Sequence, residues 1–319
     1  MISKHISSTI VLLFLVLTGS ASSRVAQTLD QSSQSTARKI ISDDFTKNRP
    51  GVQTSNSKGA ENQTNTSVRA KPKPPKRTYQ IASVSAPTKE PQPGTSTPSQ
   101  LGITIWRLRP AKANDTGARM LIREKSKSSE LVPERVEAGT SFREGDQVRL
   151  SIESAQPGYL YVVDRELLVD GSTGPAMLIY PWAGMPTGNE AGPGKLIDIP
   201  AQEDSPSYFT ARRSSPNHAG EILIVIVTSS PLNLPISDKP LEISDAELKR
   251  WEKLWGGQTE HFEMEGGAGE SWTTQEQQAA TSTGGRQLTR EDPAPQTIYR
   301  VFVTDKKGVL VNVRLLYGR

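Results

Sequence analysis

The chain lacks cysteine altogether and has only three histidines among its 319 residues. Without cysteine there can be no disulfide, no thiolate nucleophile, no zinc site with cysteine ligands and no cysteine-linked lipid anchor. Three histidines, of which His5 lies near the N-terminus, are too few for a histidine-rich metal centre. The sequence therefore predicts no metal and no cofactor.

Apolar residues are the second shortage. The residues A, V, I, L, M, F, W, Y and C make up 34% of the chain. Counted with glycine and without tyrosine the share is about 40%, below the usual 45 to 50% of globular proteins. One folded domain with a disordered stretch therefore fits this composition better than the two domains that the length alone suggests.

The first 23 residues have the organisation of a secretory signal peptide. Lys4 lies in a short basic region, residues 10–17 are apolar, and the small residues that follow allow cleavage after Ala21 or Ser23. Eight apolar residues fall far short of the roughly 20 that a membrane-spanning helix needs, so an uncleaved anchor is the weaker alternative. We expect an exported protein, periplasmic, associated with the cell envelope or secreted, with no transmembrane span after signal removal.

Residues 24–100 read as a disordered, basic linker rich in Pro, Ser and Thr. They hold 12 basic and 5 acidic residues, whereas residues 101–319 hold 25 and 29. The basic stretch 71–77 resembles a nucleic-acid patch, but a signal peptide upstream speaks against a nucleic-acid partner. We favour an extended spacer, with contact between the basic tail and an anionic envelope surface as the alternative.

Residues 101–255 are predicted to form the folded domain, because short β-branched and aromatic runs alternate there with turn residues. In the run 147–153, apolar residues alternate with polar ones, as in a half-buried antiparallel strand. A turn at 156–158 and the run 159–163 predict that these two strands form a hairpin. The run 221–227 is apolar on both faces and predicts a central strand.

Frequent short strands without alternating helices predict a mainly β fold, an antiparallel β-sandwich of the immunoglobulin-like class. One amphipathic helix is expected over 245–255, with Ser244 as its N-cap. The Gly-rich polar stretch 256–296 reads as an insertion or linker. Residues 297–319 predict a C-terminal β-hairpin that adds to the main sheet.

The ordered series of turns and strands resembles the bacterial domain of unknown function 4384 family. The resemblance spans about residues 101–232 and excludes the tail and everything after Leu232. It implies an exported domain or one attached to envelope or signalling modules, and it supplies no catalytic residues. The motifs that carry it are Thr140–Leu150, Gly158–Tyr161, Asp170–Gly171, Leu178–Pro181, Gly194–Pro200 and Gly220–Leu223.

No motif for hydrolysis or phosphate binding is present: the chain has no G-x-S-x-G, and Gly192–Lys195 does not fit a P-loop. His218 and His261 are expected in surface loops. Three acids, Asp164, Glu166 and Asp170, are expected in the loop after the strand that begins at Tyr159. They do not match the calcium-loop pattern, and solvated acids are favoured over a metal or acid–base role.

Four aromatic residues are close together in the motif series and could line a groove for a peptide or glycan. Strand alternation places about half of them in the core, so core packing is the favoured interpretation. The four are Tyr159, Tyr161, Tyr180 and Trp182.

Taken together, these patterns predict a non-enzymatic interaction or structural module of the bacterial envelope, with a protein or envelope polymer as partner. The alternative is an envelope carbohydrate-active or other hydrolytic enzyme that uses the loop carboxylates. A cleft with two facing carboxylates would favour the enzyme. An exposed aromatic or apolar patch on a closed sandwich would favour the module.

Overall fold

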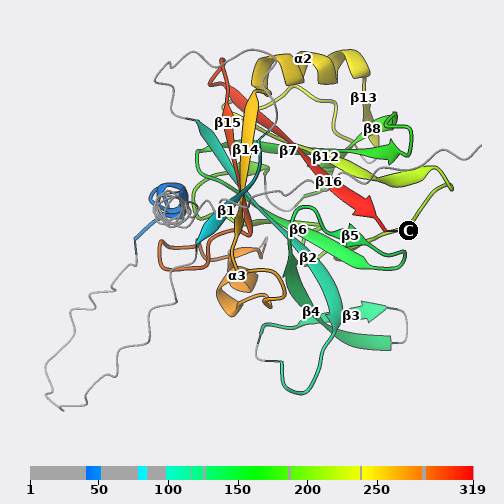
Figure 1. The fold of residues 1–319 in the computed structure, drawn as a ribbon, viewed down its shortest axis with the longest axis vertical. Coiled ribbons are helices and arrows are strands. Elements are labelled where there is room, and N and C mark those ends of the chain that lie inside the picture. The colour runs from blue at the N-terminus through cyan, green and yellow to red at the C-terminus, as the bar shows by residue number, and fades with distance from the viewer. Residues whose placement is uncertain are drawn as a thin grey trace, which may run out of the picture.

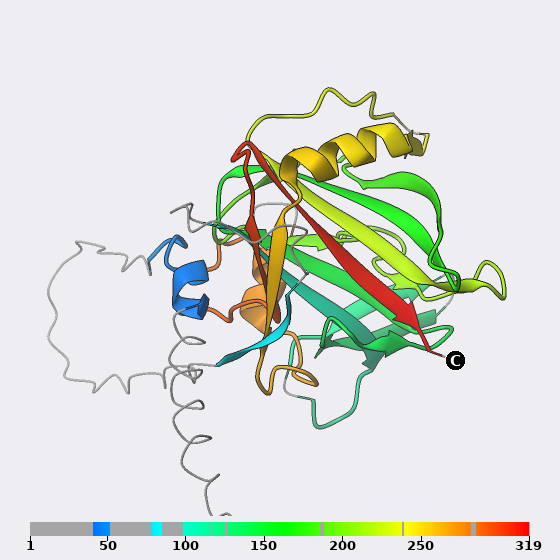
Figure 2. The same cartoon turned by 45° about the horizontal axis from the view of Figure 1, so that its top comes forward.

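The structure is a computed structural model that describes residues 41–51, 78–84, 98–115, 117–124, 127–185, 188–237, 239–281 and 285–318. The predicted signal peptide, 1–23, and much of the predicted tail lie outside these ranges. The described residues form a β-sandwich of two sheets (Figures 1 and 2), which confirms the predicted mainly β fold. Within the described ranges, no helix combines the length and apolar character needed to cross a membrane.

Nine strands make up the first sheet, here called sheet A. The strand order is β1-β14-β15-β2-β4-β3, and β6 pairs with the other edge of β2 and with the short strands β10 and β11. All of these pairs are antiparallel. The bounds are β1 Tyr79–Val84, β2 Ser99–Pro110, β3 Met120–Glu124, β4 Lys127–Val136, β6 Gln147–Ser154, β10 Ile197–Ile199, β11 Phe209–Thr210, β14 Gln258–Met264 and β15 Thr297–Phe302.

The second sheet, sheet B, has seven strands in the order β13-β8-β7-β12-β16-β5, with β9 beside β7. Its pairs are antiparallel except for the parallel contact between β16 and β5. The predicted central strand, β12, lies between β7 and β16, as its two apolar faces require. The bounds are β5 Ser141–Phe142, β7 Gly158–Leu168, β8 Thr173–Tyr180, β9 Glu190–Ala191, β12 His218–Thr228, β13 Leu241–Ile243 and β16 Gly308–Tyr317.

The alternation in β6 is present, but both of its faces are buried. Val148, Leu150 and Ile152 pack in the main core between the two sheets. Arg149 and Glu153, on the opposite face, are equally inaccessible. The outer face of sheet A is covered by chain that comes from elsewhere in the sequence, so a half-polar strand is here fully enclosed.

Part of that cover comes from residues 256–296, which we predicted to be an insertion or linker. That prediction is wrong. The segment supplies β14, which pairs with β1 and β15, and a short helix, α3, over Thr274–Ala279. Trp272 is fully buried against Trp106 of β2. The many glycine and glutamine residues of this segment suggested a linker. A few large buried side chains, which the overall composition does not reveal, hold it against the domain.

The predicted helix is confirmed as α2, Asp245–Trp255. The Ser244 side chain accepts a hydrogen bond from the backbone N–H of Glu247. Leu248, Trp251 and Trp255 pack on the outer face of sheet B, and Figure 2 shows the helix lying along that sheet. The Trp pair is therefore core, as its helical spacing indicates.

Both predicted hairpins are wrong, for one physical reason. β6 belongs to sheet A and β7 to sheet B, and likewise β15 pairs in sheet A whereas β16 pairs in sheet B. Each turn passes the chain from one sheet to the other. Turn residues specify a reversal of direction, but the return strand here finds its partners in distant strands.

The boundary of the predicted disordered tail also needs correction. Residues 41–46 are helical, residues 78–84 include β1 at the edge of sheet A, and β2 begins at Ser99. Phe45 and Tyr79 are buried in one apolar cluster with residues of β14 and β15. These two segments have too few apolar residues, and no regular spacing of them, for the sequence to predict that they pack on the domain. The rest of the tail lies outside the described residues.

Candidate functional site

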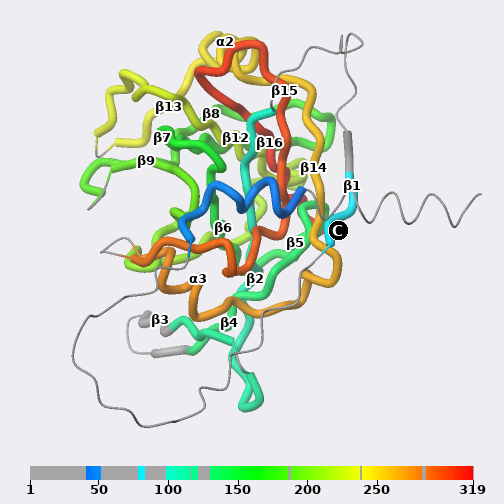
Figure 3. The backbone as a smooth tube through the Cα atoms, turned by 90° about the vertical axis from the view of Figure 1, so that its left-hand side faces the viewer, coloured from blue at the N-terminus to red at the C-terminus, as the bar shows by residue number. Residues whose placement is uncertain are grey.

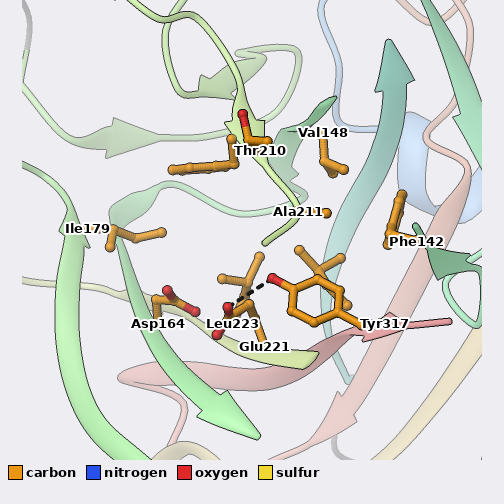
Figure 4. A pocket seen from close by; sticks show the side chains of 11 residues that line it. Phe142, Val148, Asp164, Ile179, Thr210, Ala211, Glu221, Leu223 and Tyr317 are labelled. Carbon is orange, nitrogen blue, oxygen red and sulfur yellow. Dashed lines mark hydrogen bonds between the residues drawn. The ribbon is translucent and has the colours of Figure 1, made fainter. Parts of the chain in front are cut away.

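A cavity of about 210 Å³ lies between the two sheets, where β5, β7, β8, β12 and β16 of sheet B meet β6 and β11 of sheet A. Figure 4 shows its side chains, with two carboxyl groups on one wall and apolar groups on the others. The lining comprises Phe142, Val148, Asp164, Ile179, Phe209, Thr210, Ala211, Glu221, Leu223, Leu315 and Tyr317.

The register of sheet B brings the carboxylates together. On β7 and β12, Asp164 pairs with Leu223, and Glu166 pairs with Glu221. Because alternate residues of a strand share a face, all four side chains project from the face of sheet B that meets the core, where Leu223 is buried. Asp164 and Glu221 are diagonal neighbours at one end of the sandwich.

Burial governs the ionisation of both cavity carboxylates. Burial, together with the charge of Glu221, raises the pKa of Asp164 to about 7. Burial likewise raises the pKa of Glu221 to about 7, although a hydrogen bond from the Tyr317 hydroxyl opposes the rise. Two interacting acids of this kind titrate as a pair. The cavity therefore changes charge near neutral pH.

One oxygen of each carboxyl group has no hydrogen-bond partner among the described residues: Asp164 Oδ1 and Glu221 Oε2. No described lysine or arginine forms an ion pair with either group. A buried carboxylate without a cation costs free energy. The cavity thus presents two hydrogen-bond acceptors that have no donor within the described part of the protein.

His218 supports Glu221 from the side. Its Nδ1 lies 3.0 Å from the backbone nitrogen of Ser214, which donates to it, so Nε2 carries the proton in the neutral ring. Nε2 lies 2.9 Å from the Gly220 carbonyl oxygen and 3.1 Å from Glu221 Oε1. Its ring meets the Tyr317 ring edge-on, with centroids 5.0 Å apart.

Both histidine predictions need correction. His218 is the first residue of β12 and is buried, not a surface-loop residue. His261 lies in β14, half-buried, with its ring centroid 5.4 Å from that of Tyr299. Burial lowers the pKa of His261. Polar neighbours in the sequence suggested loops, but the polar residues before His218 end where β12 begins, and those around His261 alternate with the buried Phe262 and Met264 of β14.

The predicted acidic loop is not one structural unit. Asp164 and Glu166 lie within β7, and only Asp170 lies in the turn that follows it. The exposed Asp170 carboxylate accepts hydrogen bonds from the backbone N–H and hydroxyl of Ser172, which lower its pKa. No group of three His, Asp or Glu side chains within the described residues is arranged to hold a metal ion.

The predicted aromatic face is divided between two sides of sheet B. Tyr161 is buried beneath α2, where Tyr159 packs beside it. Tyr180 is buried in the main core, with Trp182 packed against it and their ring centroids 6.0 Å apart. The four rings therefore do not share one groove, and core packing accounts for Tyr161 and Tyr180.

Sequence reasoning missed three members of the site, Glu221, His218 and Tyr317. A signal for Tyr317 was present, because it shares the apolar stripe of the last strand, whose other members pack in the core. Glu221 stands at the start of the most apolar strand of the chain. A charged residue on the core-facing side of such a strand indicates a special environment.

Comparisons with known proteins add nothing to these observations: no family model, no curated protein and no solved structure matches the chain. The resemblance to the domain of unknown function 4384 family stays a prediction.

Proposed function

We propose that the protein is an exported, non-enzymatic interaction module of the bacterial envelope, and that its cavity receives a cationic group of a protein or polymer partner. The observation that carries the proposal is the half-buried pair Asp164 and Glu221, each with one buried oxygen that lacks a partner among the described residues. An ammonium or guanidinium group would supply the donors and the charge that these oxygens need.

The size and lining of the cavity support a side chain as the occupant. About 210 Å³ is smaller than the roughly 300 to 1,000 Å³ of clefts that enclose whole small molecules. Ile179 and Leu223 offer apolar contacts to an alkyl stem, and the carboxylates lie beside them (Figure 4). Lysine and arginine have this division between an apolar stem and a charged head.

The signal-peptide pattern of residues 1–23 supports export, and the acidic charge balance of residues 101–319 supports a cationic rather than an anionic partner for the domain. The basic residues between 24 and 100 belong to an extended spacer, with weak contact to an anionic envelope surface as the alternative.

Nuclear magnetic resonance titration of the mature chain with pentylamine, an analogue of the lysine side chain, tests the proposal. We expect saturable shifts of the methyl resonances of Ile179 and Leu223 at pH 7.5, and no such shifts with pentanol. Asp164→Asn and Glu221→Gln should abolish them, whereas Asp170→Asn, which removes an exposed carboxylate, should leave them unchanged. Equal responses to the amine and the alcohol would refute a cation site.

A hydrolytic enzyme is the second candidate, because two carboxylates lie side by side in a cavity. Glycoside hydrolysis needs one acid and one ionised carboxylate flanking the sugar, whereas here burial raises both pKa values to about 7. Assays with chromogenic glycosides and esters separate the candidates. Turnover that Glu221→Gln removes would replace the module with the enzyme, and absence of turnover alongside amine binding supports the module.

A further inference from the structure

Residues 41–51 form a separate segment on the outer face of sheet A. The next described residue along the chain is Thr78, which directly precedes β1, so 26 residues separate the segment from Thr78. Figure 3 shows the segment, in blue, passing in front of sheet A. Ile41, Phe45 and Arg49, at i, i+4 and i+8, are buried, while Asp43 and Lys47 are exposed. The segment therefore contacts the domain through one stripe of side chains.

Arg49 is the most fully engaged residue of the segment, with 1% of its surface exposed. Its Nε and Nη2 lie 2.8 and 2.6 Å from the two carboxylate oxygens of Glu153 in β6. Its Nη1 donates to the carbonyl oxygens of Thr289, Asp292 and Pro293 at 3.1 to 3.3 Å. A planar guanidinium satisfies this fork of acceptors, and a lysine ammonium does not.

The receiving side of this contact is shaped for the segment. The backbone N–H of Gly194 donates to Glu153 Oε1 and orients the carboxylate toward Arg49. One turn earlier, Phe45 packs over Gly102 of β2, where an added Cβ would lie 2.6 Å from the Phe45 ring and 2.5 Å from Pro295. Glycine at this position of β2 leaves the space that the phenylalanine ring occupies.

Further polar contacts fix the direction of the segment. The Gln100 side chain donates to Asp44 at 2.6 Å, and Asn48 donates to the Ala155 carbonyl oxygen at 3.3 Å. Arg290 donates through its backbone N–H to the Pro50 carbonyl oxygen and through Nε to the Arg49 carbonyl oxygen. The domain thus holds both the side chains and the backbone of the segment, as a binding site holds a peptide.

We infer that the surface formed by Gly102, Glu153, Gly194 and residues 288–295 is a peptide-binding site, and that residues 41–51 are its ligand within the same chain. The site recognises the end of a short helix, with phenylalanine in its last turn and arginine four residues further on. The segment stays bound without the covalent connection to the rest of the chain.

The test uses the full chain with a site-specific protease sequence inserted between Asn62 and Gln63. After cleavage, the N-terminal piece should co-elute with the domain in gel filtration. Arg49→Ala should weaken retention by at least about 100-fold, because it leaves Glu153 buried without a cation. Lys47→Ala, which removes an exposed charge two residues away, should leave retention unchanged.

Exchange distinguishes binding from irreversible packing. An excess of a synthetic peptide of residues 38–51 should displace the N-terminal piece of the cleaved protein, and the same peptide with Arg49→Ala should not. Circular dichroism confirms that the cleaved variants stay folded. Release of the unmodified piece on cleavage, or equal retention of the Arg49→Ala piece, would overturn the inference. A doubled mass before cleavage would overturn its intramolecular part, because the segment would then bind a second copy. Amine binding at the cavity is independent of these outcomes.

Discussion

Two polar regions inside this protein, the outer face of sheet A and the cavity, differ in whether their carboxylates lie beside an arginine. On the outer face of sheet A, three arginines are enclosed and each forms an ion pair with a buried carboxylate: Arg49 with Glu153, Arg135 with Glu276, and Arg149 with Asp198. In the cavity of the sandwich, Asp164 and Glu221 are half-buried, each with one buried oxygen, and neither pairs with a lysine or arginine among the described residues.

The difference separates charged groups that are neutralised within the fold from carboxylates that have no cation beside them among the described residues. Arg149 also lies over the Trp272 ring, and Ser151 donates to Asp198, so this pair has most of its donors and acceptors satisfied. Full burial raises the pKa of Asp198 to about 6 against the charge of Arg149, which leaves the pair ionised at neutral pH. The cavity carboxylates instead titrate there, because no fixed cation opposes burial.

The largest effect is expected from breaking a complete pair. Arg149→Ala leaves Asp198 fully buried without a cation and should lower the free energy of unfolding by about 3 to 5 kcal/mol in urea denaturation. The exposed pair Arg250 and Glu247 provides the control, since solvent screens this pair and Arg250→Ala should leave stability nearly unchanged. If the two variants lose the same stability, the buried pairs do not hold this face together.

A smaller effect, of opposite sign, is expected from neutralising the unpaired carboxylate. The folded pKa of Asp164 is raised, so the folded state keeps its proton while the unfolded state loses it, and stability should fall as pH rises from about 4 to 7. Asp164→Asn should remove part of this fall, with a gain on the order of 2 kcal/mol at pH 8 and none at pH 3.5.

Denaturation across this pH range measures the difference between wild type and variant. Asp170→Asn is the matched control, because hydrogen bonds from Ser172 lower the pKa of this exposed carboxylate instead of raising it. If the free energy of unfolding depends on pH in the same way for wild type and Asp164→Asn, the carboxylate in the cavity does not lower the stability of the folded protein.

The smallest effect concerns the hydroxyl that supports Glu221. Tyr317→Phe removes a 2.9 Å hydrogen bond to Glu221 Oε1, so the pKa of Glu221 should rise by about half a unit to one unit, and about 1 kcal/mol should be lost at pH 8. Carboxyl-carbon titration by nuclear magnetic resonance follows the pKa directly. Tyr159→Phe, a half-buried tyrosine on the other side of the sheet, should leave it unchanged.

Local patterns predicted the elements better than their partners. The alternation of β6, the two-faced apolar run of β12 and the cap of α2 each depend on residues within one element, and each is confirmed. The predicted hairpins were wrong because the choice of sheet depends on strands about 40 to 70 residues away in sequence, as when β6 pairs with β2 and β7 with β12.

The candidate site was only partly predictable. Asp164 was singled out as an acid, but its partner Glu221 lies on a strand that pairs with β7 only in the fold. The two aromatic pairs looked like one surface because they are near in sequence, whereas a register shift between β7 and β8 and the alternation of β7 send them to opposite faces. Nothing in a linear pattern reports that shift.

By itself, the sequence determined the β-rich class, the amphipathic helix and the uneven distribution of charge, because these follow from residue spacing and composition. The missing cysteines likewise determined that packing and polar pairs, not disulfides, hold the domain. Only the tertiary structure decided which buried charged side chains lie next to a side chain of opposite charge. Arg49 and Glu153 are 104 positions apart in the sequence, and Asp164 and Glu221 lie on the neighbouring strands β7 and β12. Such distant residues come together only when the sheets are assembled.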